Sequence, residues 1–127
     1  MKYKSDNLYR IHTGKKGENI AVEYLKNNGY TILDRNFRTL LGEIDIIASN
    51  NGTLVFIEVK TRKNNSFGMI LEQVSLKKAY RISNTAEIYR IEKNLLDMDC
   101  RMDLICIFMD DKGYDLSHYS DIFHECL

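Results

Sequence analysis

Two apolar segments around a tight turn constrain the fold of this chain more than any other feature. Residues 42–48 read Gly-Glu-Ile-Asp-Ile-Ile-Ala, and residues 54–60 read Leu-Val-Phe-Ile-Glu-Val-Lys. Between them stand Asn51 and Gly52, residue types that tolerate the positive φ angles of a type I′ turn. The pattern predicts an antiparallel hairpin. Because apolar residues run almost unbroken along both strands, we expect both to be central strands that are covered on two faces.

The segments around this hairpin predict an α/β fold in which helices flank a mixed central sheet of about five strands. Thr13 is a candidate N-cap for the first helix, and Gly29 is a candidate for its end. The second helix separates the third and fourth strands, which permits these two strands to lie parallel. The predicted order is α-β-β-β-α-β-β in one domain over residues 1–127, with helices at 13–28 and 70–92 and strands at 30–37, 41–48, 53–61, 101–109 and 114–120.

Composition excludes several classes of protein. Lys and Arg balance Asp and Glu at 18 each, and 44% of the residues are hydrophobic, which is typical of a globular domain. Cys100, Cys106 and Cys126 have no paired spacing, which argues against a disulfide framework and a zinc knuckle. We find no apolar stretch typical of a signal peptide or a membrane span. We therefore expect a cytoplasmic protein that has no membrane partner.

The zero net charge hides an uneven distribution of charge along the chain. Residues 1–93 carry 16 basic and 10 acidic side chains, whereas residues 94–127 carry 2 basic and 8 acidic side chains. A basic face for nucleic acid is compatible with this distribution. Charge alone nevertheless favours a solvated surface of mixed sign.

Charged residues interrupt the apolar hairpin in a pattern that predicts a metal site. With a two-residue turn, Asp45 opposes Glu58 and Glu43 opposes Lys60, all four on one face. Like charges directly opposed at about 4.5–5.5 Å destabilise a sheet, so we expect a cation between Asp45 and Glu58. Their hard oxygen ligands favour Mg²⁺ or Mn²⁺. Lys60 points to the same side, where its ammonium group would orient an attacking water or stabilise charge on a phosphate.

A simpler interpretation makes Glu43 and Lys60 an ordinary cross-strand ion pair on a solvated face. The apolar residues around them favour the functional interpretation, because unpaired carboxylates are costly on central, covered strands. Glu18 lies one helical turn before Ala21 and would complete the metal shell directly or through water. The alternative for Glu18 is a favourable charge in the first turn of its helix.

Several neighbouring basic residues would contact a nucleic-acid backbone if the site binds one. Lys77 and Lys78 are interpreted as solvated surface charges, and Gln73 would point into the site from the second helix. The three histidines have no spacing that predicts a transition-metal site, so we interpret them as surface or hydrogen-bonded residues. The candidates for phosphate contacts are Arg62, Lys63, Arg35 and Arg38.

A resemblance to a known family rests on segments spread over nearly the whole chain. They are Gly-Glu-Asn-Ile-Ala at 17–21, Gly-Tyr-Thr-Ile-Leu-Asp-Arg-Asn at 29–36, the 42–48 segment, Val-Phe-Ile-Glu-Val-Lys-Thr-Arg at 55–62 and Phe-Gly at 67–68. These segments resemble the YraN family of small bacterial proteins. That family is grouped with endonucleases of the PD-(D/E)XK superfamily, which have a restriction-endonuclease-like fold, and is similar to archaeal Holliday junction resolvases.

The resemblance implies roles for five residues. Asp45 and Glu58 would bind the metal, Lys60 would be the catalytic lysine, Glu18 the helix-borne acid and Glu43 a supporting acid. The expected activity is Mg²⁺- or Mn²⁺-dependent hydrolysis of DNA phosphodiester bonds, with branched DNA as one candidate substrate and DNA favoured over RNA. Similarity to dimeric resolvases leaves a homodimer open. The alternative is a module that keeps the fold and binds nucleic acid or a protein without cutting. The neutral net charge favours this alternative, because it is unusual for a strong DNA-binding protein.

Overall fold

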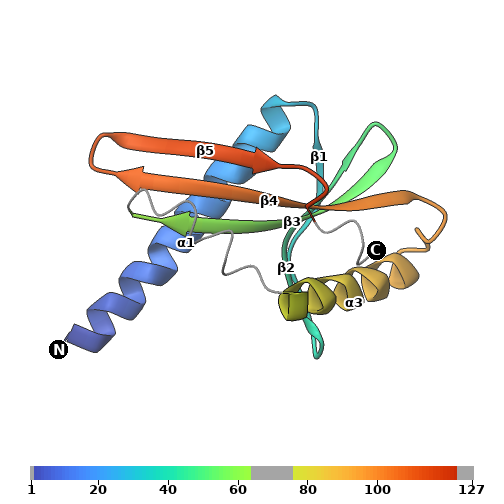
Figure 1. The fold of residues 1–127 in the computed structure, drawn as a ribbon, viewed down its shortest axis with the longest axis horizontal. Coiled ribbons are helices and arrows are strands. Elements are labelled where there is room, and N and C mark those ends of the chain that lie inside the picture. Colours follow the sequence, from blue (N-terminus) through green and yellow to red (C-terminus); the bar gives the residue numbers. More distant parts are fainter. Residues whose placement is uncertain (1, 64–75, 123–127) are drawn as a thin grey trace.

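The computed structural model describes residues 2–63 and 76–122 of the chain (Figure 1). These residues form two helices and five strands in the order α-β-β-β-α-β-β, so the predicted α/β class and element order are confirmed. The elements are α1 (Lys2–Asn27), β1 (Thr31–Thr39), β2 (Gly42–Asn50), β3 (Thr53–Arg62), α3 (Leu76–Glu92), β4 (Asp99–Asp110) and β5 (Gly113–Tyr119).

The five strands form one mixed sheet in the order β1-β2-β3-β4-β5. The pairs β1–β2, β2–β3 and β4–β5 are antiparallel, whereas β3 and β4 are parallel. A parallel pair needs a crossover connection, and α3 lies within the connection between these two strands. The predicted parallel pairing is therefore confirmed, as are the central positions of β2 and β3 and the edge position of β5.

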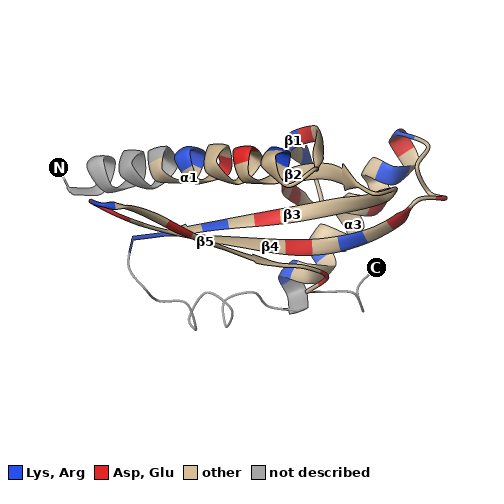
Figure 2. Ribbon diagram, turned by 90° about the horizontal axis from the view of Figure 1, so that it is seen from above, with Lys and Arg blue, Asp and Glu red and all other residues tan. Residues whose placement is uncertain are grey.

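The two helices cover opposite faces of the sheet (Figures 1 and 2). On one face, α1 contributes Ala21, Val22 and Leu25 to a cluster with alternate side chains of β2, β3 and β4. On the other face, α3 contributes Ala79, Ile82, Ala86 and Tyr89 to a second cluster. Removing these apolar side chains from water is the main favourable contribution to folding. The partners are Ile46, Ala48, Val55, Ile57, Ile105 and Ile107 in the α1 cluster and Ile44, Ile47, Leu54, Phe56 and Met102 in the α3 cluster.

Residues at the predicted hairpin turn and at the predicted end of the first helix have the positive φ angles that these positions favour. Asn51 and Gly52 have φ angles of 49° and 79°, as a type I′ turn requires. Gly29, which follows α1, has a φ of 85°. A left-handed residue directly after a helix is a common way for the chain to leave it.

The first helix is longer than predicted. It begins at Lys2 instead of near Thr13. The prediction relied on buried apolar residues, which mark the half of α1 that packs on the sheet, whereas residues 2–13 contain neither proline nor glycine and so do not interrupt helical hydrogen bonding. Residues 70–75 of the predicted second helix lie outside the described residues. In the described part of the chain, neither helix has an apolar stretch long enough to cross a bilayer.

A buried polar network ties α1 to the far strands of the sheet. The Asp103 carboxylate is fully buried and accepts hydrogen bonds from His118 Nε2 at 2.7 Å and Arg101 Nε at 3.1 Å. Because a carboxylate only accepts, His118 carries its proton on Nε2, and Nδ1 accepts from the Tyr24 hydroxyl of α1 at 2.9 Å. Arg101 also donates to the Tyr30 hydroxyl at 2.7 Å. His118 is thus hydrogen-bonded as predicted, whereas His124 and the side chain of His12 lie outside the described part.

Candidate active site

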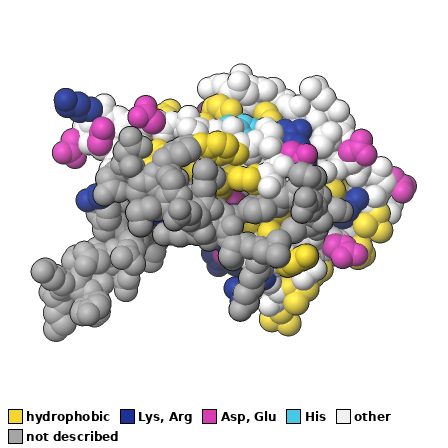
Figure 3. Space-filling model, in the orientation of Figure 1, with side chains coloured by type: hydrophobic (Ala, Val, Ile, Leu, Met, Phe, Trp, Pro, Cys, Tyr) yellow, Lys and Arg dark blue, Asp and Glu magenta, His cyan; other side chains and the backbone are white. Residues whose placement is uncertain are grey.

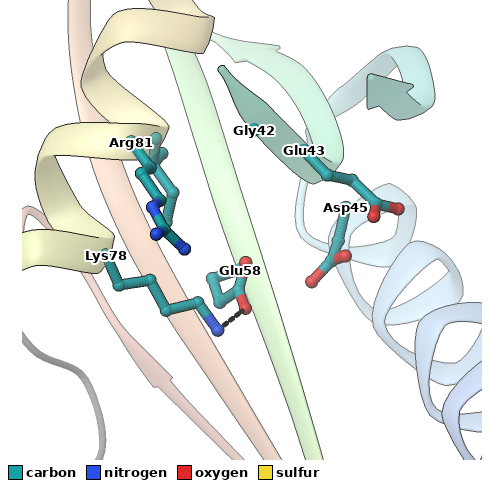
Figure 4. Close-up of a pocket in the computed structure, with 7 residues that line it drawn as sticks. Gly42, Glu43, Asp45, Glu58, Lys78 and Arg81 are labelled. Atoms are coloured by element: carbon teal, nitrogen blue, oxygen red, sulfur yellow. Dashed lines mark ion pairs between the residues drawn. The ribbon is translucent and has the colours of Figure 1, made fainter. Parts of the chain in front are cut away.

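A pocket of about 440 Å³ opens between the ends of β2 and β3 and helix α3 (Figure 4). Acidic side chains from the two strands form one wall, and basic side chains from α3 form the other. The pocket therefore collects three of the predicted acidic residues together with two basic residues. Its lining residues are Gly42, Glu43, Asp45, Glu58, Lys78, Arg81 and Ile82.

The pairing register of β2 with β3 is the predicted one, but the ladder stops short of the acidic residues. It runs from the pair Asn50–Thr53 to the pair Ile46–Ile57 and ends there. Asp45 and Glu58 are consequently not a ladder pair, and the prediction of two opposed charge pairs across a continuous ladder is wrong. The strands separate at this point, which gives the pocket its opening.

A local irregularity in β1 and β2 explains the separation. Ile44 and Ile47 both pack in the α3 cluster, whereas regular alternation would place Ile44 on the α1 face. In the β1–β2 register, Asp45 stands opposite Asn36, which has a φ of 53°. Few residues other than glycine adopt this left-handed conformation, and asparagine is the one that tolerates it best. The regular alternation of β2 is therefore broken at Asp45, the position at which its pairing with β3 has ended.

The side chain of Asp45 takes the place of the missing strand pairing. Its Oδ2 accepts a hydrogen bond from the backbone N–H of Val59 at 2.8 Å. A buried backbone N–H that lost its strand partner would otherwise be left without an acceptor. This bond holds the Asp45 carboxylate in the gap between the two strands, beside Glu58 (Figure 4).

Glu58 carries two ammonium groups on one carboxylate oxygen. Its Oε1 lies 3.2 Å from Lys60 Nζ and 2.7 Å from Lys78 Nζ, and its side chain is only 11% exposed. Lys60 therefore lies beside Glu58, as predicted from the Glu-Val-Lys spacing. The interpretation of Lys78 as a solvated surface charge is wrong, because α3 packs against this face and directs the side chain into the pocket.

Glu43 has a different partner from the predicted one. Its Oε1 lies 3.2 Å from Arg38 Nε of β1, and the Arg38 side chain is 73% exposed. The simpler interpretation, in which Glu43 and Lys60 form a cross-strand ion pair, is wrong, because the β2–β3 ladder ends before it reaches these positions. Glu43 lines the mouth of the pocket while Asp45 lies deeper in the gap.

Burial and like charges shape the electrostatics of the site. Burial, followed by the negative charges of Glu58, Glu18 and Glu43, raises the pKa of Asp45 to about 7, although the Val59 N–H opposes the shift. Burial and the neighbouring Lys78 lower the pKa of Lys60 from its usual value, against the attraction of Glu58. Burial also acts to lower the pKa of Lys78, but contacts with Glu58 outweigh it and raise that pKa above its usual value.

Glu18 reaches the site from the opposite face of the sheet. Its carboxylate lies 3.8 Å from Arg35 Nη2, its side chain is 18% exposed, and its charge is close enough to contribute to the raised pKa of Asp45. The preceding residue, Gly17, packs so closely on Thr61 of β3 that a Cβ atom would overlap the threonine side chain. This close approach of α1 to β3 brings Glu18 near the gap, on the side of the helix that its spacing from Ala21 predicts.

The donor set fits a hard divalent cation held mainly by two carboxylates. Asp45 and Glu58 share a gap in which a buried carboxyl has a raised pKa, and a cation there would relieve the repulsion between them. In residues 2–63 and 76–122, no three acidic, histidine or cysteine side chains come together as a complete metal site. Mg²⁺ commonly takes one or two carboxylates and fills its shell with water and substrate phosphates, so two carboxylates suffice.

The other predicted residues have varied positions. Arg35 donates to Asn19 Oδ1 at 2.8 Å and stands beside Glu18, so it joins β1 to α1. Arg62 donates to the carbonyl oxygen of Thr61 at 2.8 Å, and Lys63 is exposed directly after β3. Gln73 lies outside the described residues. Both acidic and basic side chains are visible among the described residues in Figure 3.

The residue that sequence reasoning undervalued most is Lys78, which lies one helical turn before Arg81. Both lie on the same side of α3 as the buried Ile82 and line the pocket. Their spacing of three residues, combined with the apolar periodicity of the helix, is the signal that places them on its inner side.

Comparisons with known proteins agree on one family. The sequence pattern of the uncharacterised protein family UPF0102 matches residues 17–107. The chain is 46% identical over 100 residues to a UPF0102 protein of Dictyoglomus turgidum, covering 79% of this chain and 85% of that one. It is 45% identical over 112 residues to a UPF0102 protein of Alkaliphilus oremlandii, covering 87% and 96%. A UPF0102 protein of Clostridium acetobutylicum is 41% identical over 120 residues, with 91% and 98% covered. The chain belongs to the UPF0102 family, which is the YraN family that its motifs resemble.

Proposed function

We propose that this protein is a Mg²⁺- or Mn²⁺-dependent endonuclease that hydrolyses phosphodiester bonds in DNA, with branched DNA such as a four-way junction as a candidate substrate. The single observation that carries the proposal is the convergence of Asp45, Glu58 and Lys60 where the β2–β3 ladder ends. Two partly buried carboxylates with a lysine beside them suit phosphodiester cleavage. The resemblance to PD-(D/E)XK endonucleases supports the same activity.

Each residue has a role that follows from its surroundings. Asp45 and Glu58 would hold the cation, and Glu18 would complete its surroundings directly or through water. A divalent ion held by these residues would supply Lewis acidity toward the phosphate and would make an attacking water easier to deprotonate. Burial and Lys78 lower the pKa of Lys60, which increases the fraction of neutral amine, the form that would accept a proton from the attacking water.

One observation favours a second candidate, a module that binds nucleic acid without cutting. Lys78 Nζ lies 2.7 Å from Glu58 Oε1, so the chain supplies its own cation to this carboxylate. In a non-catalytic module, this ion pair would be permanent and the pocket would need no metal. The neutral net charge is also unusual for a strong DNA-binding enzyme.

Cleavage of labelled DNA distinguishes the two candidates. We would incubate linear, flapped and four-way-junction DNA with the protein and Mn²⁺, and compare wild type with Asp45→Asn and Lys60→Ala. Asp99→Asn is the matched control, because Asp99 is exposed and pairs with Thr53 at the other end of β3. Cutting by wild type and Asp99→Asn, lost in the other two variants, supports the enzyme. Salt-sensitive retention of DNA by wild type without any cutting supports the module.

A further inference from the structure

The two walls of the pocket have opposite charge, and one contact already joins them. Glu58 on the acidic wall accepts from Lys78 on the basic wall at 2.7 Å (Figure 4). Arg81, three residues later on α3, also lines the pocket and is exposed. A cation site with basic side chains facing it is the arrangement that a metal ion and a bound phosphate would need together.

We propose that Lys78 occupies the cation position at Glu58 when no metal is bound, and that a divalent ion displaces it toward a backbone phosphate of nucleic acid, which Lys78 and Arg81 then hold together. This inference rests on the proposed metal-dependent function. It adds an exchange at Glu58 between the ammonium group of Lys78 and a divalent metal ion from solution. It also assigns α3 as the phosphate-contacting element of the site.

Competition for one oxygen atom makes the exchange necessary. Oε1 of Glu58 already has Lys60 Nζ at 3.2 Å and Lys78 Nζ at 2.7 Å. A divalent ion bound to Glu58 and Asp45 would bring two more positive charges to this place and would repel both ammonium groups. Lys60 is the more buried of the two, at 21% exposure against 33% for Lys78. Lys78, the more exposed of the two ammonium groups, is therefore the one that the ion would displace.

The backbone of α3 is held in place, so the exchange is a movement of side chains. A Cβ on Gly42 of β2 would lie 3.0 Å from Thr85 Oγ1 and 3.3 Å from the Arg81 carbonyl oxygen, which shows how closely the strand and the helix pack. Thr85 Oγ1 in turn donates to that carbonyl oxygen at 2.8 Å. The flexible four-carbon stem of lysine can redirect its ammonium group without moving the helix.

A phosphate is the chemical group that suits the displaced lysine. Lys78 and Arg81 are one turn apart on α3, so their cationic groups can approach the same anion from one side. The guanidinium of Arg81 offers paired N–H donors to phosphate oxygens, and Lys78 adds a point charge. Metal binding and nucleic-acid binding would then reinforce each other, and the coupling must be equal in both directions.

The exchange predicts opposite effects on two ligands from one substitution. Lys78→Gln should bind Mn²⁺ about three- to tenfold more tightly than wild type, because the competing cation is gone. The same variant should lose most of the gain in DNA affinity that a divalent ion gives to wild type. Arg81→Gln should tighten Mn²⁺ binding less than Lys78→Gln does, because Lys78 is the cation that contacts Glu58, and should lower DNA affinity, with the salt slope reduced by about one.

The experiment titrates Mn²⁺ alone into the full chain by calorimetry, and follows a labelled DNA duplex by fluorescence anisotropy in EDTA and in Ca²⁺. Lys78→Arg keeps the charge and should retain the wild-type Mn²⁺ affinity. Lys112→Gln is the matched control, since Lys112 is exposed in the β4–β5 turn. Thermal melting of every variant checks the fold, because Lys78→Gln leaves Glu58 with one partner fewer.

The outcomes separate this inference from the proposed nuclease function. Tighter Mn²⁺ binding by Lys78→Gln, with wild-type behaviour of Lys78→Arg and Lys112→Gln, supports the exchange even if wild type cuts no DNA. Equal or weaker Mn²⁺ binding by Lys78→Gln overturns the exchange even if wild type cuts DNA. A wild-type chain that does not bind Mn²⁺ at millimolar concentration overturns both.

Discussion

Gly17 of α1 lies directly against Thr61 of β3, so close that no larger residue fits at position 17 without displacement. Glycine in the middle of a helix usually destabilises it by about 0.5–1 kcal/mol relative to alanine. Here the close packing of α1 against β3, which only glycine permits at this position, offsets that cost. That approach brings Glu18, the next residue, to the gap that holds Asp45.

Alanine substitutions at two glycines of α1 should change stability in opposite directions. Gly17→Ala should lower the free energy of unfolding by about 1–3 kcal/mol, because the added methyl group overpacks the contact with Thr61. Gly14→Ala is the matched control, since a Cβ there would meet none of the described atoms within 4 Å. It should raise stability by about 0.5–1 kcal/mol. Urea denaturation measures both, and equal stabilisation by the two substitutions would show that α1 does not approach β3 at Gly17.

Removing the charge of Asp45 should stabilise the fold while it weakens the site. The raised pKa of Asp45 means that ionising this carboxyl costs folding free energy, and that the cost is fully present above about pH 7. Asp45→Asn should therefore raise the free energy of unfolding by about 1–2 kcal/mol at pH 8. The gain should shrink as the pH falls toward 4, where the wild-type carboxyl is neutral in the folded state. Lower stability of Asp45→Asn at pH 8 would contradict the burial of this charge.

Stability at low pH should depend on Asp103. Burial acts to raise the pKa of Asp103, but hydrogen bonds from His118, the Asp121 N–H and Arg101 outweigh it and hold that pKa below its usual value. A carboxyl with a depressed pKa contributes stability above its unfolded pKa of about 3.9, and this contribution is lost as the pH falls through the folded pKa.

Asp103→Asn should accordingly cost about 2–4 kcal/mol at pH 7, because it leaves the buried partners of the carboxylate without a negative charge. The difference from wild type should narrow below pH 4, which acid titrations of circular dichroism can follow. Asp115→Asn on the exposed face of β5 is the control and should behave as wild type. If the difference in the free energy of unfolding between Asp103→Asn and wild type stayed constant with pH, the effect would come from packing and not from charge.

The four acidic side chains should contribute unequally to Mn²⁺ binding. Asp45→Asn and Glu58→Gln should each weaken it by about tenfold or more, since both carboxylates share the gap. Glu18→Gln should have a smaller effect, because Glu18 stands behind Asp45 near Arg35. Glu43→Gln should have the smallest, because the side chain is 41% exposed and paired with Arg38. The Mn²⁺-induced shift in the melting temperature of each variant measures this order. If Glu43→Gln had the largest effect, the metal would bind at the mouth of the pocket and not between Asp45 and Glu58.

The sequence by itself determined the elements and the register of the central hairpin. The nearly unbroken apolar segments and the Asn51–Gly52 turn act over short distances along the chain, so they specify strand pairing before any tertiary contact is known. The same local information placed Glu58 and Lys60 on one side of β3. It also predicted the parallel pairing of β3 with β4, because a crossover helix separates them.

Only the tertiary structure decided which of these residues meet. The broken alternation of β2 at Asp45 and the left-handed conformation of Asn36 are not encoded by the periodicity of either strand. Helices α1 and α3 position Glu18 and Lys78 near the same gap from opposite faces of the sheet. Contacts of this kind join residues far apart in the chain, so they follow from the packing of whole elements and not from the residue types at neighbouring positions.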